Sequence, residues 1–239
     1  MVLNFAHRGS VTEAPENTVS AMEKALEHGV QAIELDVQLT KDHELIVIHD
    51  HHLRRFNKRA KRLVNQYTLA EIRRIDVGSY FSRAFTKERL ATLTELLNVI
   101  PEDILINIEI KNAPIIYEGI EKILLDTLQA ERRMNNVMIS SFDHVSLQYV
   151  QKEAPTIPLG LLFEHRIIRP WEYAKSSGLD VCSIHPKKTH VDKQFVEGCH
   201  QDGYKVFPFT VNDIETYEQF IQWGVDGVFS NNPAIFSQT

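Results

Sequence analysis

The strongest constraint on the fold is a regular alternation along the chain of short apolar, β-branched runs with longer amphipathic stretches. Eight runs are predicted as strands: Val2–Ala6, Ala32–Val37, Ile104–Ile110, Val137–Ser140, Leu159–Phe163, Val181–Ile184, Val206–Phe209 and Gly227–Phe229. Helices are expected near residues 18–28, 93–99, 115–129, 143–153, 171–177, 192–202, 213–223 and 232–236. Eight strand–helix units favour a closed (β/α)8 TIM barrel over an open doubly wound sheet. We therefore predict an α/β fold in which residues 1–239 form one barrel domain.

One segment interrupts this rhythm. Residues 51–92 contain a possible short helix at Leu69–Ile75 but no convincing strand, and we interpret them as an insertion after the second strand. Leu45–His49, just before it, is a candidate for a short additional strand. The insertion also carries a basic cluster that could attract anionic lipid but that we interpret as a solvated surface: Arg54, Arg55, Lys58, Arg59, Lys61 and Arg62.

Charge and composition exclude several classes of protein. The formal net charge of -6 argues against nucleic acid as a partner, so any anionic ligand must be met by a local site. No run approaches the roughly 18 apolar residues of a spanning helix, and no targeting signal is recognisable at the N-terminus, so a cytoplasmic protein without stable membrane association is expected. Cys182 and Cys199 lack the number and spacing of a disulfide framework or a zinc site and are expected to be reduced.

Charged residues occupy two strands that a parallel barrel should bury. In the second strand, Glu34 and Asp36 share one face by period-two alternation, and in the third Glu109 shares a face with Asn107 and Lys111. Carboxylates that face inward repel one another and lose hydration, so something positive must lie among them. Three such groups with no thiolate nearby suit one divalent hard cation, Mg²⁺ or Ca²⁺. The alternative is pairing with Lys or Arg on the outer helices.

Two histidines stand at predicted strand ends, His7 after the first strand and His49 before the insertion. Because histidine titrates near neutrality, a facing pair can supply a base and an acid for one reaction, whereas each alone is more often structural. Arg8 offers a forked cation suited to a phosphate oxygen. His185 is a further candidate, and these histidines are expected to be solvated: His28, His43, His51, His144, His165 and His200.

Several motifs in order resemble the glycerophosphodiester phosphodiesterase family. The first part of the chain carries His7-Arg8-Gly9, Pro15-Glu16-Asn17-Thr18, Glu34-Leu35-Asp36-Val37 and His49-Asp50. The resemblance continues through Leu93 to Leu97, Glu109-Ile110-Lys111, Ser141-Phe142, Thr210-Val211-Asn212, Gly224-Val225-Asp226-Gly227 and Pro233. It thus covers essentially the whole chain and implies the same barrel, with its insertion at residues 51–92.

The resemblance also implies roles for individual residues. Glu34, Asp36 and Glu109 would be the metal ligands, His7 and His49 the acid–base pair, and Arg8 and Lys111 the phosphate contacts. Phe209 stands where the family often has a tryptophan, and it is expected to pack against the glycerol moiety of the substrate. Asn231 stands where an aspartate is usual, and this departure, like that at Phe209, bears on substrate fit.

The expected function is metal-dependent hydrolysis of glycerophosphodiesters to glycerol 3-phosphate and an alcohol by histidine acid–base catalysis. Choline, ethanolamine and glycerol are all compatible head groups. A related barrel phospholipase acting on intact or lyso-phospholipids is an alternative that should show an exposed apolar rim. A catalytically silent barrel that binds phosphodiesters or metal is a second alternative, which has no evident need for a paired acid and base.

Overall fold

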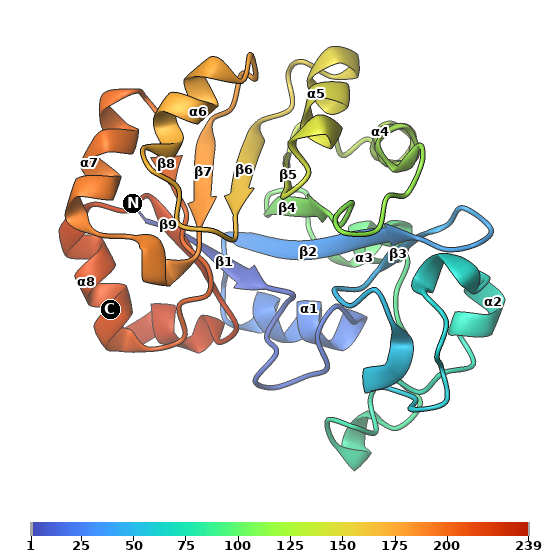
Figure 1. The fold of residues 1–239 in the computed structure, drawn as a ribbon. Coiled ribbons are helices and arrows are strands. Elements are labelled where there is room, and N and C mark those ends of the chain that lie inside the picture. The colour runs from blue at the N-terminus through green and yellow to red at the C-terminus, as the bar shows by residue number, and fades with distance from the viewer. Residues whose placement is uncertain (1, 239) are drawn as a thin grey trace.

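The computed structural model describes residues 2–238, and eight parallel strands in this range form a nearly closed barrel (Figure 1). The strand order is β8-β7-β6-β5-β4-β2-β1-β9, and amide hydrogen bonds of Asp226 to Val206 (3.2 Å) and of Phe229 to Pro208 (3.0 Å) join the two ends. The strands are β1 (Leu3–His7), β2 (Ala32–Leu39), β3 (Leu45–Val47), β4 (Leu105–Ile110), β5 (Val137–Ser141), β6 (Leu159–Phe163), β7 (Ser183–Pro186), β8 (Lys205–Val206) and β9 (Gly227–Ser230). The predicted barrel is confirmed.

Helices surround the barrel on its outer side (Figure 1). They are α1 (Val19–Glu27), α2 (Leu69–Ile72), α3 (Leu93–Val99), α4 (Ile120–Ala130), α5 (His144–Glu153), α6 (Pro170–Ser176), α7 (Lys193–Gln201) and α8 (Ile214–Trp223). The Thr18 hydroxyl accepts a hydrogen bond from the Ala21 amide and thereby caps the N-terminus of α1. The last expected helix is instead a 3₁₀ segment, Pro233–Gln238.

Several other boundaries differ from the prediction; β7, for example, spans Ser183–Pro186 instead of 181–184, and α2 ends at Ile72 instead of Ile75. Helix α4 begins at Ile120 because the Asn112 side chain accepts a hydrogen bond from the Tyr117 amide and Gly119 takes a left-handed φ of 79°, so the preceding residues form a loop. Strand β8 has only two residues, although the amides of Phe207 and Phe209 still donate to the carbonyls of Ile184 and Pro186 in β7.

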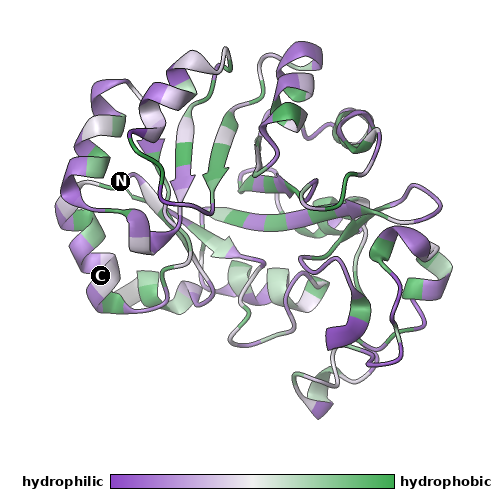
Figure 2. Cartoon of the chain, viewed as in Figure 1, coloured by the Kyte–Doolittle hydropathy of each residue, from purple (hydrophilic) through white to green (hydrophobic). Residues whose placement is uncertain are grey.

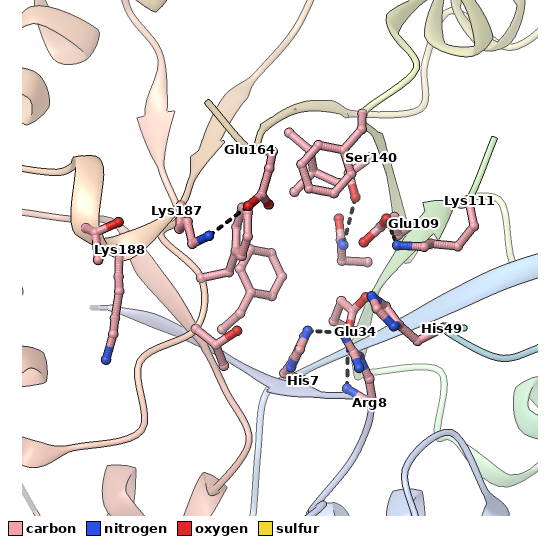
Figure 3. Close-up of a pocket in the computed structure, with 17 residues that line it drawn as sticks. His7, Arg8, Glu34, His49, Glu109, Lys111, Ser140, Glu164, Lys187 and Lys188 are labelled. Atoms are coloured by element: carbon pink, nitrogen blue, oxygen red, sulfur yellow. Dashed lines mark hydrogen bonds and ion pairs between the residues drawn. The ribbon is translucent and has the colours of Figure 1, made fainter. Parts of the chain in front are cut away.

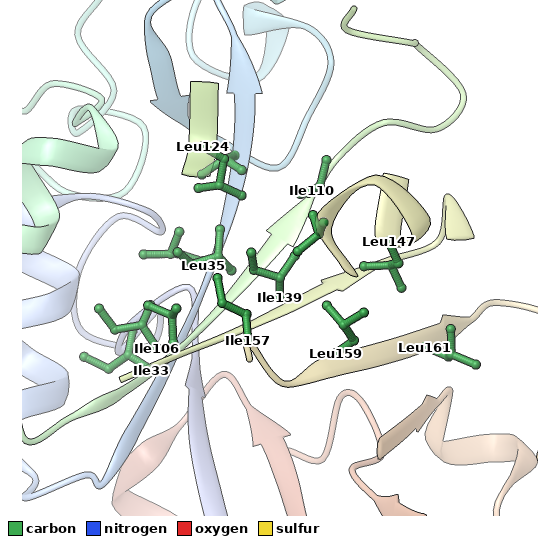
Figure 4. Close-up of a cluster of buried hydrophobic side chains, with 14 of the residues drawn as sticks. Ile33, Leu35, Ile106, Ile110, Leu124, Ile139, Leu147, Ile157, Leu159 and Leu161 are labelled. Carbon is green, nitrogen blue, oxygen red and sulfur yellow. The ribbon is translucent and has the colours of Figure 1, made fainter. Parts of the chain in front are cut away.

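Alternate residues along the strands point to two separate hydrophobic cores, one between the barrel and its helices and one inside the barrel. The outward residues of β2, Ile33, Leu35 and Val37, are fully buried against the helix layer, to which α4 contributes Leu124 and α5 Leu147 (Figure 4). Inside the barrel an aromatic cluster that includes Phe5, Phe207 and Phe229 fills the core. Hydrophilic and hydrophobic residues therefore alternate along β2 (Figure 2), because Glu34, Asp36 and Gln38 face inward.

The insertion packs as a small unit on the barrel. Strand β3 runs antiparallel to β2, with Val47 opposite Val37, which confirms the additional strand. A separate hydrophobic core then joins Ile46 of β3 to the segment 53–90: Leu53, Ala60, Val64, Tyr67, Ile72, Val77 and Leu90.

Within residues 2–238, no helix is both long enough and apolar enough to cross a membrane.

Candidate active site

The candidate residues meet at the carboxyl ends of three neighbouring strands (Figure 3). In the sheet register His7 of β1 lies beside Glu34 of β2, and Asp36 of β2 lies beside Glu109 of β4. They surround a cavity of about 410 Å³ whose lining also includes Arg8, His49, Lys111 and Phe209. The structure thus gathers the residues to which the family resemblance assigns roles, with Asp36 fully buried next to the cavity.

The three carboxylates form one buried group. Glu34, Asp36 and Glu109 each offer an oxygen within 4.8 Å of the others. The pKa of Glu34 is raised well above its usual value, mainly by burial and secondarily by the two neighbouring carboxylates. Burial also raises the pKa of Glu109. Burial opposes ionisation of Asp36 as well, but Arg8 and Lys111 outweigh it and lower its pKa.

Local cations neutralise this group only in part. Arg8 Nε lies 3.3 Å from Asp36 Oδ2, and Lys111 Nζ lies 2.8 Å from Glu109 Oε1 and 3.8 Å from Asp36 Oδ1. Asp36 Oδ1 is buried without a hydrogen-bond partner, which costs free energy unless a cation meets it. The carboxylates therefore pair with site residues and not with the outer helices, and the oxygen-only donor set fits Mg²⁺ or Ca²⁺.

The turn after β1 aims Arg8 into the site. Arg8 and Gly9 both take left-handed conformations, with φ of 60° and 84°, and a Cβ on Gly9 would lie 2.6 Å from the Ala21 backbone of α1. The Arg8 amide donates to Glu34 Oε2 over 3.1 Å. Only glycine at position 9 lets the backbone pass this close to α1. The resulting turn fixes the position of the Arg8 side chain.

His7 is held from both sides. Its Nδ1 lies 2.6 Å from Asn231 Oδ1, and its Nε2 lies 3.8 Å from Glu34 Oε2. Burial, aided by the neighbouring Arg8, lowers the pKa of His7 to about 3, so the ring is neutral at pH 7. Because an amide oxygen only accepts, the proton of this neutral ring is on Nδ1 and the lone pair on Nε2. The sequence had marked Asn231 only as a departure in substrate fit.

His49 belongs to a second network that reaches into the insertion. Its Nδ1 lies 3.0 Å from Asp50 Oδ1. The Arg55 guanidinium binds both oxygens of Asp50, with Nε 2.9 Å from Oδ2 and a terminal nitrogen 2.6 Å from Oδ1. The third guanidinium nitrogen of Arg55 lies 2.6 Å from Glu16, which also pairs with Arg8 over 3.3 Å. Arg55 is exposed, as expected for the basic cluster, but it also forms ion pairs with Glu16 and Asp50.

The opposite wall of the cavity is aromatic and charged. Phe209 and Phe142 meet edge to face with their ring centroids 5.9 Å apart. Lys187 pairs with Glu164 over 2.7 Å at the cavity edge, facing the carboxylates across the cavity in Figure 3. Sequence reasoning missed this pair because neither residue belongs to a recognisable motif.

The remaining histidines do not join the site. His185 is fully buried inside the barrel, hydrogen-bonded to Ser183 Oγ over 2.8 Å and packed against Phe207 and Phe229. Of those expected to be solvated, His28, His51 and His144 are half-buried, because each bonds to a partner on another segment. His43, His165 and His200 are exposed as expected.

The comparisons with known proteins agree with this geometry. Residues 7–235 match the model of the glycerophosphoryl diester phosphodiesterase family. A glycerophosphodiester phosphodiesterase from Caldanaerobacter subterraneus subsp. tengcongensis is 41% identical over 97% of this chain and 94% of its own, and one from Bacillus altitudinis is 38% identical over 96% and 94%. The structure of an Oleispira antarctica phosphodiesterase in complex with the product sn-glycerol-3-phosphate superposes with a TM-score of 0.89 at 29% identity, covering 98% of this chain and 94% of that one. This chain therefore belongs to the glycerophosphoryl diester phosphodiesterase family of enzymes.

Proposed function

We propose that this enzyme hydrolyses glycerophosphodiesters to glycerol 3-phosphate and an alcohol, with one divalent metal ion and two histidines of opposite roles. Two observations carry the proposal. Three buried carboxylates have oxygens within 4.8 Å of one another, and the two histidines beside them are each fixed by a contact at Nδ1. A silent binding barrel has no need for two imidazoles fixed in this way.

The metal would be held by Glu34, Asp36 and Glu109, whose oxygens suit Mg²⁺ or Ca²⁺. When bound, such an ion lowers the pKa of an attacking hydroxyl and stabilises the charge that develops on phosphate oxygens. Arg8 and Lys111 line the same cavity, and we assign them to the remaining phosphate oxygens. Phe209, across the cavity, offers an apolar wall for the carbon atoms of glycerol.

We assign His7 as the base. Since its proton is on Nδ1 and donated to Asn231, Nε2 carries the lone pair and is free to take a proton from the glycerol 2-hydroxyl. The alkoxide oxygen then forms a bond to phosphorus as the bond to the head-group oxygen breaks. The product of this step is a cyclic phosphate, which water opens to glycerol 3-phosphate.

We assign His49 as the acid. In the acid role its ring donates Nδ1–H to the Asp50 carboxylate and Nε2–H to the departing alcohol oxygen. In the second step the roles reverse: His49 takes a proton from water and His7 returns one to the 2-hydroxyl. The two proton transfers therefore balance over one turnover.

A coupled assay for glycerol 3-phosphate tests this function. Glycerophosphocholine, glycerophosphoethanolamine and glycerophosphoglycerol are supplied in turn, with and without chelator, and we expect release only when metal is present. The cyclic phosphate is sought in quenched reactions by phosphorus NMR. Turnover that persists in excess chelator contradicts the metal role, and the absence of the cyclic phosphate under trapping conditions contradicts attack by the 2-hydroxyl.

A further inference from the structure

Exposed apolar side chains gather on one half of the barrel mouth. Ile116 follows β4, Val145 follows β5, and Ile167, Ile168 and Tyr173 follow β6. Their exposed fractions are 61%, 71%, 39%, 90% and 42%, and we call these five residues the apolar rim. Among residues 2–238, they make up most of the large hydrophobic side chains with substantial exposure. Scattered apolar residues need no explanation, but a group beside a cavity marks an interaction surface.

Hydrogen bonds and a ring contact hold the segments of the rim together. His144, next to Val145, bonds to the Tyr173 hydroxyl over 2.8 Å, and the Phe163 ring packs edge to face on Tyr173. Asn112, at the start of the loop that contains Ile116, bonds to Asp143 at the N-terminus of α5 over 3.1 Å. The segments that carry the rim are therefore in contact with one another at three neighbouring strand ends.

The loop between β6 and α6 places positive charge beside the exposed apolar side chains. Residues 164–169 are all exposed, and Ile167 and Ile168 are flanked by Arg166 and Arg169. The structure gives Arg166 no ion-pair partner within residues 2–238. Arg169 pairs with Glu172 over 2.9 Å, but both side chains are about 60% exposed, so this bond is weak and readily exchanged.

An aliphatic tip between two arginines matches an anionic lipid surface. Isoleucine side chains gain free energy by entering the acyl region, and guanidinium groups remain at the level of the lipid phosphates. Lys187 lies at the edge of the neighbouring cavity, although its own partner is Glu164. A chain with a formal net charge of -6 has no general attraction to anionic membranes, so the attraction must be local to this loop.

We propose that the apolar rim is a reversible docking surface for anionic lipid bilayers, with Ile167 and Ile168 entering the interface and Arg166 and Arg169 contacting lipid phosphates. Docking places the mouth of the barrel toward the membrane, where the catalytic cavity can receive phosphodiesters that derive from lipids. The proposal goes beyond hydrolysis of free glycerophosphodiesters and does not depend on it, because binding is measured without turnover. Few basic residues and a short apolar tip predict transient rather than permanent attachment.

Vesicle sedimentation tests the proposal. Wild-type protein is mixed with sucrose-loaded vesicles of equimolar phosphatidylglycerol and phosphatidylcholine, or of phosphatidylcholine alone, at low and high salt. We expect binding to the anionic vesicles that weakens as salt increases. Ile168→Asp should lower the partition coefficient by roughly tenfold or more, since it removes one buried aliphatic side chain and adds a negative charge. Arg166→Gln should cause a smaller loss that disappears at high salt.

Ile221→Asp is the matched control, because Ile221 is 37% exposed on α8, outside the rim, and the same substitution there should leave vesicle binding unchanged. All variants should turn over soluble glycerophosphocholine as the wild type does, which reports intact folding and separates docking from catalysis. Wild-type protein that stays in the supernatant overturns the proposal, as does equal binding by Ile168→Asp. A wild-type dimer in size-exclusion chromatography that Ile168→Asp converts to a monomer assigns the rim to a second copy of the chain instead.

Discussion

His7 and Asn231 come from the first and the last strand regions of the barrel, yet their side chains lie 2.6 Å apart. Asn231→Leu should lower kcat on glycerophosphocholine by on the order of 10²-fold with little change in KM, because Nδ1 loses its acceptor and the ring loses its fixed tautomer. Asn231→Asp should retain activity and raise the pKa of His7 above about 3, since a carboxylate favours the protonated ring. Nitrogen NMR of the imidazole reports both effects, and an unchanged tautomer in Asn231→Leu contradicts this role.

The two histidines should differ in their response to the leaving group. On glycerophosphocholine, His7→Ala and His49→Ala should each lose about 10² to 10⁴ in rate, the usual contribution of positioned proton transfer. On a nitrophenyl analogue, only His49→Ala should recover, because nitrophenolate departs without a proton. If His7→Ala recovers instead, the assignment is reversed. If neither recovers while both still bind metal, separate acid and base roles are wrong.

Removal of a buried carboxylate should separate metal binding from folding. Because burial raises the pKa of Glu34, its ionised form is unfavourable in the metal-free protein, and Glu34→Gln should fold as well as the wild type or better in chelator. Added Mg²⁺ or Ca²⁺ should raise the Tm of the wild type but have little effect on the variant. Thermal denaturation with and without metal measures both. A variant that unfolds, together with a wild type that neither binds nor needs metal, would favour a purely structural role.

Arg55 should affect catalysis through the residues that it holds. Arg55→Gln should lower kcat by roughly 10- to 100-fold on alcohol-leaving substrates, because Asp50 is no longer fixed beneath His49. Arg55→Lys should recover only part, since an ammonium cannot replace the fork on Asp50. Arg54→Gln is the control, because Arg54 is exposed and, within residues 2–238, bonds only to the Lys61 carbonyl. A nitrophenyl substrate should be less sensitive to Arg55→Gln, and equal losses on both substrates contradict a role through His49.

His185 should make the stability of the fold depend on pH. Burial lowers its pKa from 6.5 to about 3, so between these values the unfolded chain binds a proton that the folded chain does not. Stability therefore rises with pH across this window and falls as pH drops from about 6.5 toward 3. From pH 7.5 to pH 5 the contribution is about 2 kcal/mol. Urea denaturation at the two pH values measures it, and His185→Gln, which has no group to protonate, should show a correspondingly smaller difference.

The sequence predicted the barrel and the central residues because both follow from local patterns. Repeated strand–helix units specify the architecture, and the i, i+2 spacing of Glu34 and Asp36 specifies that they share a face, so the meeting of these carboxylates with Glu109 was foreseeable. Element ends were less predictable. The start of α4 depends on the hydrogen bond that the Asn112 side chain accepts from the Tyr117 amide, and the spacing of hydrophobic residues does not predict such a bond.

The supporting contacts of the site could not be predicted in the same way. Arg55 lies in a run of basic residues with no periodicity, and only folding of the insertion brings it between Asp50 and Glu16. The Lys187 pair with Glu164 likewise joins two loops that are distant in sequence. Such contacts depend on the register of neighbouring strands and on loop conformation, neither of which a composition or spacing rule contains.

Strand β1 pairs with β2 on one side and with β9 on the other, and this arrangement has a consequence for synthesis on the ribosome. Nearly all of the chain must emerge before residues 227–230 can seal the gap beside β1. Asn231, which follows immediately, completes the setting of His7. An interrupted translation product would therefore carry all three carboxylates and both histidines, but with an open barrel and an unrestrained His7.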